Sequence, residues 1–265
     1  MRPLVTLTTD FGLQDAYVAA MKGVMLSIEP TLRLVDITHL VAPQDVMEAA
    51  FLLSQAVPHF PAGTVHLSVV DPGVGTARRP LAARLGDQLF VGPDNGVLAL
   101  LLEDEDPDAL VVLDQPTYWR IPTPSATFHG RDIFGPVAAH LASGRRLDEV
   151  GTPTDTYQQL HWALPLADDE GIQGWVVHID RYGNCITNIP RTLLERDPRS
   201  RQAKYYVGAV ILDRLSHTYA DVPSGEPLAL IGSSHHLEVS VNEGHAATLL
   251  SIHKGSPVNL VYGDD

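Results

Sequence analysis

The hydrophobic pattern of this 265-residue chain changes near residue 150. Up to that point, apolar runs typical of strands alternate with segments whose apolar residues recur at helical spacing. Beyond it, short strand-like runs follow one another, with Gly, Pro, Asn and Ser between them. The chain is therefore predicted to form an α/β domain over 1–150 and a small all-β domain over 172–265. The segment 151–171, with Pro, Asp and Thr along its length, is expected to link them.

The α/β prediction rests on a strand–helix–strand–helix–strand order. Such an order joins successive strands by helical crossovers, which place the strands parallel in one sheet. The expected strands lie at 4–10, 32–38 and 64–71, and the expected helices at 15–28, 45–57, 97–103 and 134–144.

The composition narrows the class of protein and of partner. A net charge of −14 leaves no basic surplus to neutralise phosphates, so nucleic acid is not expected as a partner. Cys185 is the single cysteine, which excludes a disulfide framework and a Cys-rich zinc site. No uncharged apolar stretch approaches the roughly 18 residues of a membrane span, and the N-terminal sequence lacks the apolar core of a signal peptide. We therefore expect a cytoplasmic protein without a membrane partner.

Two carboxylates follow predicted strands of the first domain. Asp10 ends the first strand and Asp71 the third, and ligands of parallel sheets bind beyond the carboxyl ends of the strands. The segment "VVDPGVGTARR" (69–79) contains Asp71 but lacks the third Gly of a dinucleotide loop and the G-K-[ST] of a phosphate loop. Asp10 and Asp71 share no metal-ligand spacing with His129, so no metal site is predicted.

Two other segments carry candidate site residues. "FHGRDIFGP" (128–136) places His129 just before the last expected helix of the first domain. In "HIDRYGNCITNI" (178–189), Asp180, Tyr182 and Asn184 alternate, and in a strand they would point to one face. A carboxylate, an aromatic ring and an amide on one face suit a ligand with an amine and a heterocycle. The alternative is a solvent-facing strand with a turn at "YGN".

Seven collinear segments together resemble one family, the S-adenosyl-L-methionine (SAM) hydroxide adenosyltransferases. These are adenosine-forming SAM hydrolases, homologous to the bacterial fluorinase and chlorinase. The resemblance spans about residues 4 to 262. It implies a Rossmann-like, mostly parallel sheet with flanking helices, followed by a small β-barrel-like domain. The segments are "TTDFG", "VDITH", "VVDPGVGTAR", "GPDNGVL", "TFHGRDIFGPVAAHLA", "DRYGNCITNI" and "HLEVSVNEGHAA".

The resemblance also implies the reaction and its catalytic residues. Water or hydroxide attacks the ribose C5′ of SAM, and methionine leaves as a neutral thioether. The family's Asp, Arg and His correspond to Asp71, Arg78 and His129, with Arg79 adjacent to the arginine. A carboxylate and an imidazole can orient a water and accept its proton, and an arginine can hold the carboxylate ionised. Which of Asp71 and His129 is the base stays open.

The family's substrate contacts fall on both predicted domains. Asp10 corresponds to the residue that binds the ribose hydroxyls, Asp180 to the one that binds the methionine ammonium, and Asn184 to the one at the adenine or ribose edge. Further contacts are implied beside the nucleoside for Phe128 and Tyr182, at the methionine carboxylate for Ser233, and at the adenine for Glu238 and Val241. The resemblance implies no metal or redox cofactor. It also implies a homotrimer that holds SAM between subunits.

Two positions depart from the family pattern. His235 stands where relatives usually have Gly, and Gln44 where the fluorinase has Trp.

The halogenases carry Tyr in place of Asp71 and of His129, because a carboxylate repels a halide ion at short range. SAM hydrolysis is therefore favoured over halogenation. A SAM- or adenosine-binding module with negligible turnover would need Asp10 but not Asp71. A metal-dependent nucleotidase is the weakest alternative.

Overall fold

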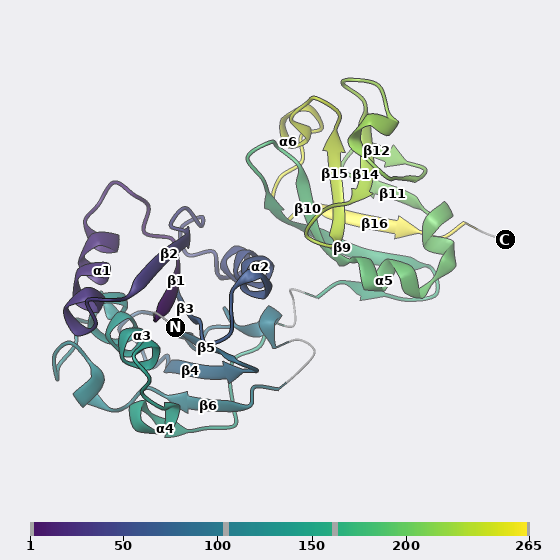
Figure 1. Ribbon diagram of the computed structural model, residues 1–265. Helices are drawn as coiled ribbons and strands as arrows, with labels where there is room; N and C mark the ends of the chain where they lie inside the picture. The colour runs from purple at the N-terminus through teal and green to yellow at the C-terminus, as the bar shows by residue number, and fades with distance from the viewer. Residues whose placement is uncertain (1–2, 103–105, 161–163, 264–265) are drawn as a thin grey trace. The chain divides into compact units, whose positions relative to one another are not determined.

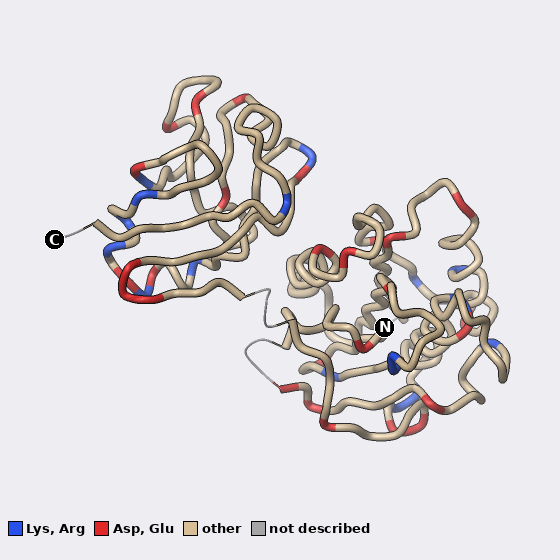
Figure 2. Tube along the Cα trace, turned by 180° about the vertical axis from the view of Figure 1, so that it is seen from behind, with Lys and Arg blue, Asp and Glu red and all other residues tan. Residues whose placement is uncertain are grey.

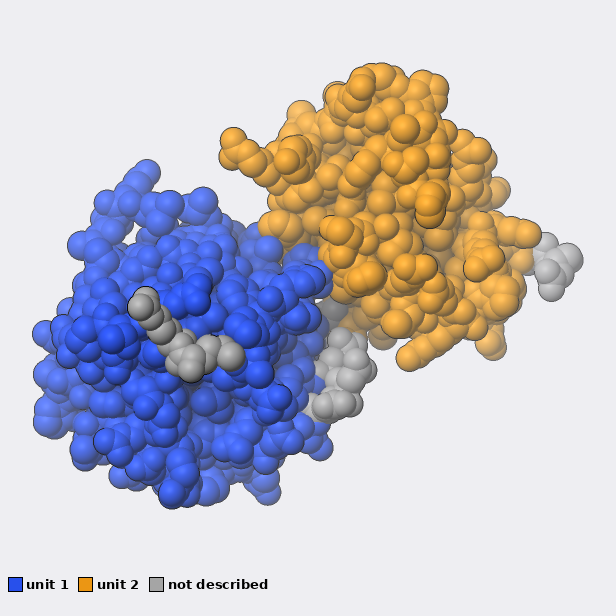
Figure 3. Space-filling view, viewed as in Figure 1, with its two compact units in different colours: residues 1–160 blue, residues 161–265 orange. Residues whose placement is uncertain are grey.

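The computed structural model describes residues 3–102, 106–160 and 164–263. The chain divides into two compact units, residues 1–160 and 161–265 (Figure 3). Each unit has its own sheet and its own hydrophobic core (Figure 1).

The first unit is built on a mixed sheet, in the order β2-β1-β3-β5-β4-β6-β7 among the described residues. The neighbouring pairs from β2 to β5 are parallel, as predicted, and the remaining pairs are antiparallel. The sheet is therefore mixed rather than mostly parallel. The reason is the short connection between β4 and β5, which permits a hairpin but no crossover. The strands are β1 (Leu4–Thr9), β2 (Arg33–Thr38), β3 (Val65–Val69), β4 (Pro80–Leu85), β5 (Gln88–Pro93), β6 (Ala109–Val112) and β7 (Thr152–Pro153).

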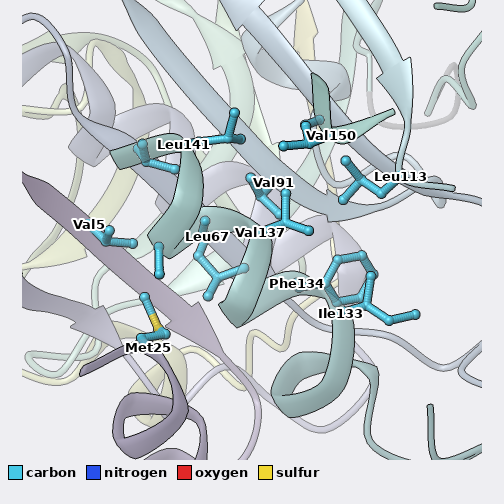
Figure 4. Close-up of a cluster of buried hydrophobic side chains, with 14 of the residues drawn as sticks. Val5, Met25, Leu67, Val91, Leu113, Ile133, Phe134, Val137, Leu141 and Val150 are labelled. Atoms are coloured by element: carbon cyan, nitrogen blue, oxygen red, sulfur yellow. The ribbon is translucent and has the colours of Figure 1, made fainter. Parts of the chain in front are cut away.

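Helices cover both faces of this sheet (Figure 1). On one face lie α1 (Tyr17–Ile28), α3 (Gly135–Ala142) and α4 (Leu147–Val150), and on the other lies α2 (Val46–Ala56). Successive strand residues point to opposite faces, so Val91 joins the core under α1 and α3 while Phe90 joins the core under α2. Figure 4 shows Val137 of α3 beside Leu67 and Val91. Removing this apolar surface from water stabilises the layered arrangement.

The predicted helices form with one exception. The segments expected at 15–28, 45–57 and 134–144 contain α1, α2 and α3. Asp45 caps α2 by accepting the Glu48 N–H at 2.9 Å. Of the expected helix at 97–103, residue 103 lies outside the described residues, and residues 97–102 form only the 3-10 turn η2 (Ala99–Leu101), because Leu98, Leu101 and Leu102 pack into the core and offer no polar face for a surface helix. The other short elements are η1 (Val57–His59), η3 (Pro116–Tyr118) and the π-helical turn η4 (Gly130–Phe134).

The second unit contains a nine-stranded sheet that is curled almost into a barrel. Its order is β12-β11-β16-β9-β10-β15-β14-β13 in the described part of the chain, with β8 beside β9. The edge strand β12 also contacts β14 near the other end, so the sheet nearly closes on itself. Tyr205, Ile189 and Val239 lie in its buried core. The strands are β8 (Leu166–Ala167), β9 (Gly171–Ile179), β10 (Cys185–Pro190), β11 (Lys204–Val207), β12 (Val210–Leu212), β13 (Leu215–Ser216), β14 (Pro227–Ile231), β15 (His236–Val241) and β16 (Pro257–Val261).

Short helical elements lie between the strands of the second unit. They are α5 (Arg191–Arg196), η6 (Pro198–Gln202), η7 (Tyr219–Asp221) and α6 (Ala246–Leu249).

The expected linker, residues 151–171, is partly regular structure, because β7 pairs with β6 and β8 pairs with β9. Its residues 161–163 lie outside the described residues. Acidic residues occur along the chain in both units (Figure 2). None of the described helices is both long and apolar enough to span a membrane.

Candidate functional site

Two strand ends place candidate carboxylates at one edge of the first sheet. Strands β1 and β3 are parallel neighbours, and Thr9 is paired with Val69. Asp10 directly follows Thr9, and Asp71 follows Val69 with Val70 between them. Both carboxylates therefore leave the sheet at the edge where ligands of parallel sheets bind.

Asp71, Arg78 and His129 form a buried cluster, which we call the catalytic cluster. Arg78 donates from Nε to Asp71 Oδ1 at 3.0 Å and from Nη2 to Asp71 Oδ2. The two residues therefore form a bidentate ion pair. The same Nη2 lies 2.9 Å from Nδ1 of His129. The side chains of Asp71 and Arg78 are only 5% and 7% exposed. Arg78 Nη1 is buried and has no hydrogen-bond partner among the described residues, so it remains able to bind an added ligand.

The charges of the cluster are set by burial and by the arginine. Burial raises the pKa of the Asp71 carboxyl above its usual value, against the opposing effect of Arg78. Burial and the nearby Arg78 charge lower the pKa of the His129 imidazole, so His129 is neutral at pH 7. Since a guanidinium only donates, Nδ1 of His129 is the acceptor, and the neutral ring carries its hydrogen on Nε2.

The loop that carries Asp71 and Arg78 depends on a glycine. Gly75 has a φ of +76°, and a Cβ there would collide with the carbonyl oxygen of Ala126. The two adjacent arginines have different partners. Arg78 binds Asp71, whereas Arg79 binds Asp94 through Nε and Nη2. The structure therefore brings Arg78, and not Arg79, to the candidate catalytic residues.

Asp10 and Phe128 lie beside the cluster at the same edge of the unit. Asp10 Oδ2 accepts the backbone N–H of Gln44 at 2.8 Å, where Gln44 has a left-handed φ of +67°. The ring of Phe128 packs edge-on against Phe11 and Tyr17, with centroids 5.7 and 5.2 Å away. Phe11 directly follows Asp10, and Phe128 directly precedes His129. The contact between these two rings therefore packs the segment that carries Asp10 against the segment that carries His129.

The second unit contains a pocket of about 720 Å³ that we call the β-unit pocket. All six residues predicted as substrate contacts in this unit line it: Asp180, Tyr182, Asn184, Ser233, Glu238 and Val241. Three of the lining residues are carboxylates, namely Asp180, Glu238 and Glu243, and none is Lys or Arg. The pocket therefore suits a cationic ligand. A second cavity of about 680 Å³ beside α5 contains none of the predicted residues.

The local structure at Asp180 differs from the predicted strand face. Residues 180–184 form a turn between β9 and β10, not a strand. Asp180 Oδ1 accepts the N–H groups of Tyr182 and Asn184, both at 2.9 Å, and Gly183 has a φ of +88°. Asp and Gly favour such a turn over a continued strand. The three predicted side chains still line one pocket, because the turn wraps around the Asp180 carboxylate.

Glu238 is a buried carboxylate held by hydroxyl groups. Its Oε1 accepts from Tyr219 Oη and Ser240 Oγ, both at 2.7 Å. A Cβ at Gly232 would collide with Oε2, so a larger residue there would displace the Glu238 carboxylate. The Glu238 side chain thus has a fixed orientation at the wall of the pocket.

Several pocket residues were not predicted from the sequence. Tyr219 and His245 line the pocket, as does Ser234, whose buried Oγ has no hydrogen-bond partner among the described residues. No local pattern marks Tyr219. The signal for Ser234 was its place next to Ser233, and the signal for His245 was the nearby motif "HLEVSVNEGHAA". Among the described residues, no group of three or more His, Cys, Asp or Glu side chains is arranged to hold a metal ion.

His235 gives a prediction about stability. Its φ of +58° is left-handed, a conformation that favours glycine. We expect His235→Gly to raise the free energy of unfolding by about 0.5–1 kcal/mol in urea titrations. His217→Gly is the matched control, because His217 is also exposed in this unit but lacks a positive φ, and it should lower stability. A His235→Gly protein less stable than the parent would contradict the prediction.

Comparisons with known proteins cover the whole chain. The models of the SAM hydroxide adenosyltransferase N-terminal and C-terminal domains match residues 5–151 and 174–259. An (R)-S-adenosyl-L-methionine hydrolase of Salinispora tropica is 41% identical, with 98% of each chain covered. One of Thermus thermophilus is 42% identical, with 98% of this chain and 100% of the relative covered. A fluorinase of Actinoplanes sp. is 29% identical over 97% of each chain.

A solved structure has the same fold. The crystal structure of an uncharacterised conserved protein from Thermotoga maritima superimposes with a TM-score of 0.89. It is 36% identical and covers 97% of this chain and 99% of its own. The fold, the collinear motifs and both domain matches agree over nearly the full length. This chain belongs to the SAM hydroxide adenosyltransferase family.

Proposed function

We propose that this protein hydrolyses SAM to adenosine and L-methionine. The observation that carries the proposal is the catalytic cluster, in which a buried carboxylate, a guanidinium and a neutral imidazole meet at the ligand-binding edge of the first sheet. The names of full-length relatives at about 41% identity support the same activity. A binding module would have no need of this cluster.

The proposed reaction is a single displacement at the ribose C5′. The oxygen of a water forms a bond to C5′ while the C5′–S bond breaks. The electron pair of that bond goes to sulfur, so the sulfonium becomes the neutral thioether of methionine. The leaving group needs no proton, and the reaction requires no metal or redox cofactor. The protein has to align the water and accept its proton.

Asp71 is the proposed base. Nδ1 of the neutral His129 accepts from Arg78, so its only in-plane lone pair is engaged and its N–H is on Nε2. Asp71 accepts two hydrogen bonds from Arg78 and one from the backbone N–H of Gly73, which leaves one of the roughly four lone-pair sites of the carboxylate to accept a proton. A pKa raised by burial makes this carboxylate a better proton acceptor. In this scheme His129 orients the water by donating from Nε2, and Arg78 holds both residues.

The remaining predicted residues are proposed to bind SAM. Asp10 accepts from the two ribose hydroxyls, and Phe128 packs beside the nucleoside. In the β-unit pocket, Asp180 binds the ammonium of methionine, and Asn184 forms hydrogen bonds with the adenine or ribose edge of the nucleoside. Tyr182 is proposed to lie beside the nucleoside, Glu238 and Val241 beside the adenine, and Ser233 at the methionine carboxylate. The acidic lining of the pocket supports a cationic substrate.

The cluster argues against halogenation. A halide ion at C5′ would lie close to the buried Asp71 carboxylate, and two anions repel strongly where water is excluded. The direct test is to incubate the purified protein with SAM and chromatograph the products, with and without a chelator and a halide salt. Adenosine and methionine in all samples are expected. No adenosine would refute the proposed function, a 5′-halo product would indicate a halogenase, and loss of activity with chelator would indicate a metal enzyme.

We further propose that the protein is a homotrimer whose sites are shared between subunits. The candidate catalytic residues belong to residues 1–160 and the ammonium-binding candidate Asp180 to residues 161–265. If one copy's first unit works with another copy's second unit, mixing Asp71→Ala and Asp180→Ala proteins should restore part of the activity. A mixed trimer then contains some sites made of two unmutated parts.

The measurement is adenosine formation after subunit exchange has been verified by mass spectrometry. Activity above that of the two mutants measured apart is the expected result. Mixing each mutant with itself is the control. A verified mixture that is no more active than its components would contradict the shared site, because each chain would then carry its own defect.

A further inference from the structure

The sheet order places the end of β5 under the loop that carries Asp71 and Arg78. Strand β5 lies between β3 and β4 in the sheet. The connection from β3 to β4, residues 70–79, must therefore pass over the carboxyl end of β5. The residues that follow β5 there are Asp94 and Asn95, within the segment "GPDNG". Neither residue belongs to the catalytic cluster.

Asn95 holds the start of this loop. Its Nδ2 donates to the carbonyl oxygen of Val70 at 2.8 Å, one residue before Asp71. Its own side-chain oxygen accepts the N–H of Val97 at 3.2 Å, which fixes the orientation of the amide. The peptide that leads into Asp71 is thus bound to the end of the neighbouring strand through a side chain, beyond the point where the β3–β5 ladder stops.

Asp94 holds the end of the loop. Its backbone N–H donates to the Arg79 carbonyl at 2.9 Å, and its Oδ2 accepts from Arg79 Nε and Nη2 at 2.9 and 2.6 Å. Asp94 is 8% exposed, whereas the Arg79 side chain is 34% exposed, so this ion pair is partly shielded from water. Its other oxygen accepts the N–H of Gln158 at 2.7 Å. Arg79 directly follows Arg78, so this contact fixes the backbone from which the Arg78 side chain extends.

We propose that Asp94 and Asn95 are positioning residues for the hydrolysis of SAM. By holding both ends of residues 70–79, they set the approach of Arg78 to Asp71 and hence the geometry of the base. This inference rests on the proposed function. It deepens that function by assigning a role to two residues that touch neither the cluster's side chains nor the β-unit pocket.

The test is a double-mutant cycle on adenosine formation. Asn95→Ala should lower kcat about 10-fold to 10²-fold, as expected for a small misplacement of catalytic groups, and should change KM for SAM much less. In the Asp71→Ala background, Asn95→Ala should cause little further loss, because it acts through the group already removed. Arg79→Lys keeps the charge but loses the two-pronged contact with Asp94, and should also lower kcat.

Asp108→Ala is the matched control. Asp108 Oδ2 accepts the N–H of Gly86 at 2.7 Å, in the turn at the opposite end of β4 and β5. It should reduce stability comparably but keep kcat. The inference is overturned if Asn95→Ala and Arg79→Lys retain the kcat of the parent, if Asp108→Ala loses as much, or if the losses from Asn95→Ala and Asp71→Ala multiply. Failure of the unmutated protein to form adenosine would instead refute the proposed function. Arg79→Lys decides the matter if Asn95→Ala does not fold.

Discussion

Replacing Asp71 with Ala is expected to lower the turnover number for SAM by about 10²-fold or more. The substitution removes the proposed base from the catalytic cluster and leaves Arg78 with an unpaired, buried charge. The affinity for SAM should change much less, because in the proposed scheme Asp71 contacts the attacking water and not the substrate. Steady-state adenosine formation gives the rate, and calorimetry with SAM on the inactive variant gives the affinity.

Asp71→Asn separates the two effects of this substitution. It keeps the size and one acceptor oxygen toward Arg78 but cannot accept the proton, so it should lose turnover nearly as much as Asp71→Ala while folding more stably. Asp148→Ala is the control, because Asp148 forms an exposed surface ion pair with Arg146 and the variant should keep full activity. An Asp71→Asn enzyme with the turnover of the parent would remove Asp71 from the chemistry.

Replacing Asp10 with Ala is expected to weaken the binding of both adenosine and SAM by about 2–4 kcal/mol, the size of two charge-assisted hydrogen bonds. The ribose hydroxyls are common to the two ligands, so both affinities should fall together. Isothermal titration with adenosine gives the first value, and titration of SAM into the Asp71→Ala, Asp10→Ala double variant gives the second.

A comparison with 2′-deoxyadenosine distinguishes ribose binding from a structural role. Asp10 also accepts the Gln44 N–H, so its removal disturbs the loop before α2. If Asp10 binds the hydroxyls, the parent protein should prefer adenosine to 2′-deoxyadenosine, and Asp10→Ala should lose most of that preference. An unchanged preference in the variant would mean that Asp10 only supports the loop.

The sequence predicted the fold where one pattern decides the structure. Apolar spacing identified β1 to β3 and α1 to α3, since burying one face of an element leaves a clear period in the sequence. It did not predict the mixed sheet, because parallel and antiparallel strands have similar patterns and only the short β4–β5 connection distinguishes them. The run at 97–102, which precedes Glu103, is apolar on all sides, so its periodicity carries no information about helix length.

The candidate site was predictable in part for the same reason. Strand ends located Asp10 and Asp71, because the topology of a parallel sheet carries successive strand ends to one edge. The grouping of Asp180 and Asn184 was correct, but it arises from a turn and not from a strand face. Tyr219 meets Glu238 only through the curled sheet, a contact between distant segments that no local pattern predicts. The relative placement of the two site halves stays a proposal.

The acidic lining of the β-unit pocket has a consequence for product inhibition. SAM carries a sulfonium charge that the proposed reaction removes, and neither adenosine nor methionine regains it. If SAM binds in this pocket as proposed, Asp180, Glu238 and Glu243 attract it more strongly than either product, since no Lys or Arg lines the pocket. Breaking the C5′–S bond removes the sulfonium charge, so the electrostatic attraction between the pocket and the bound molecule falls at that step. A pocket of this charge thus favours the release of adenosine and methionine even after both products have accumulated in solution.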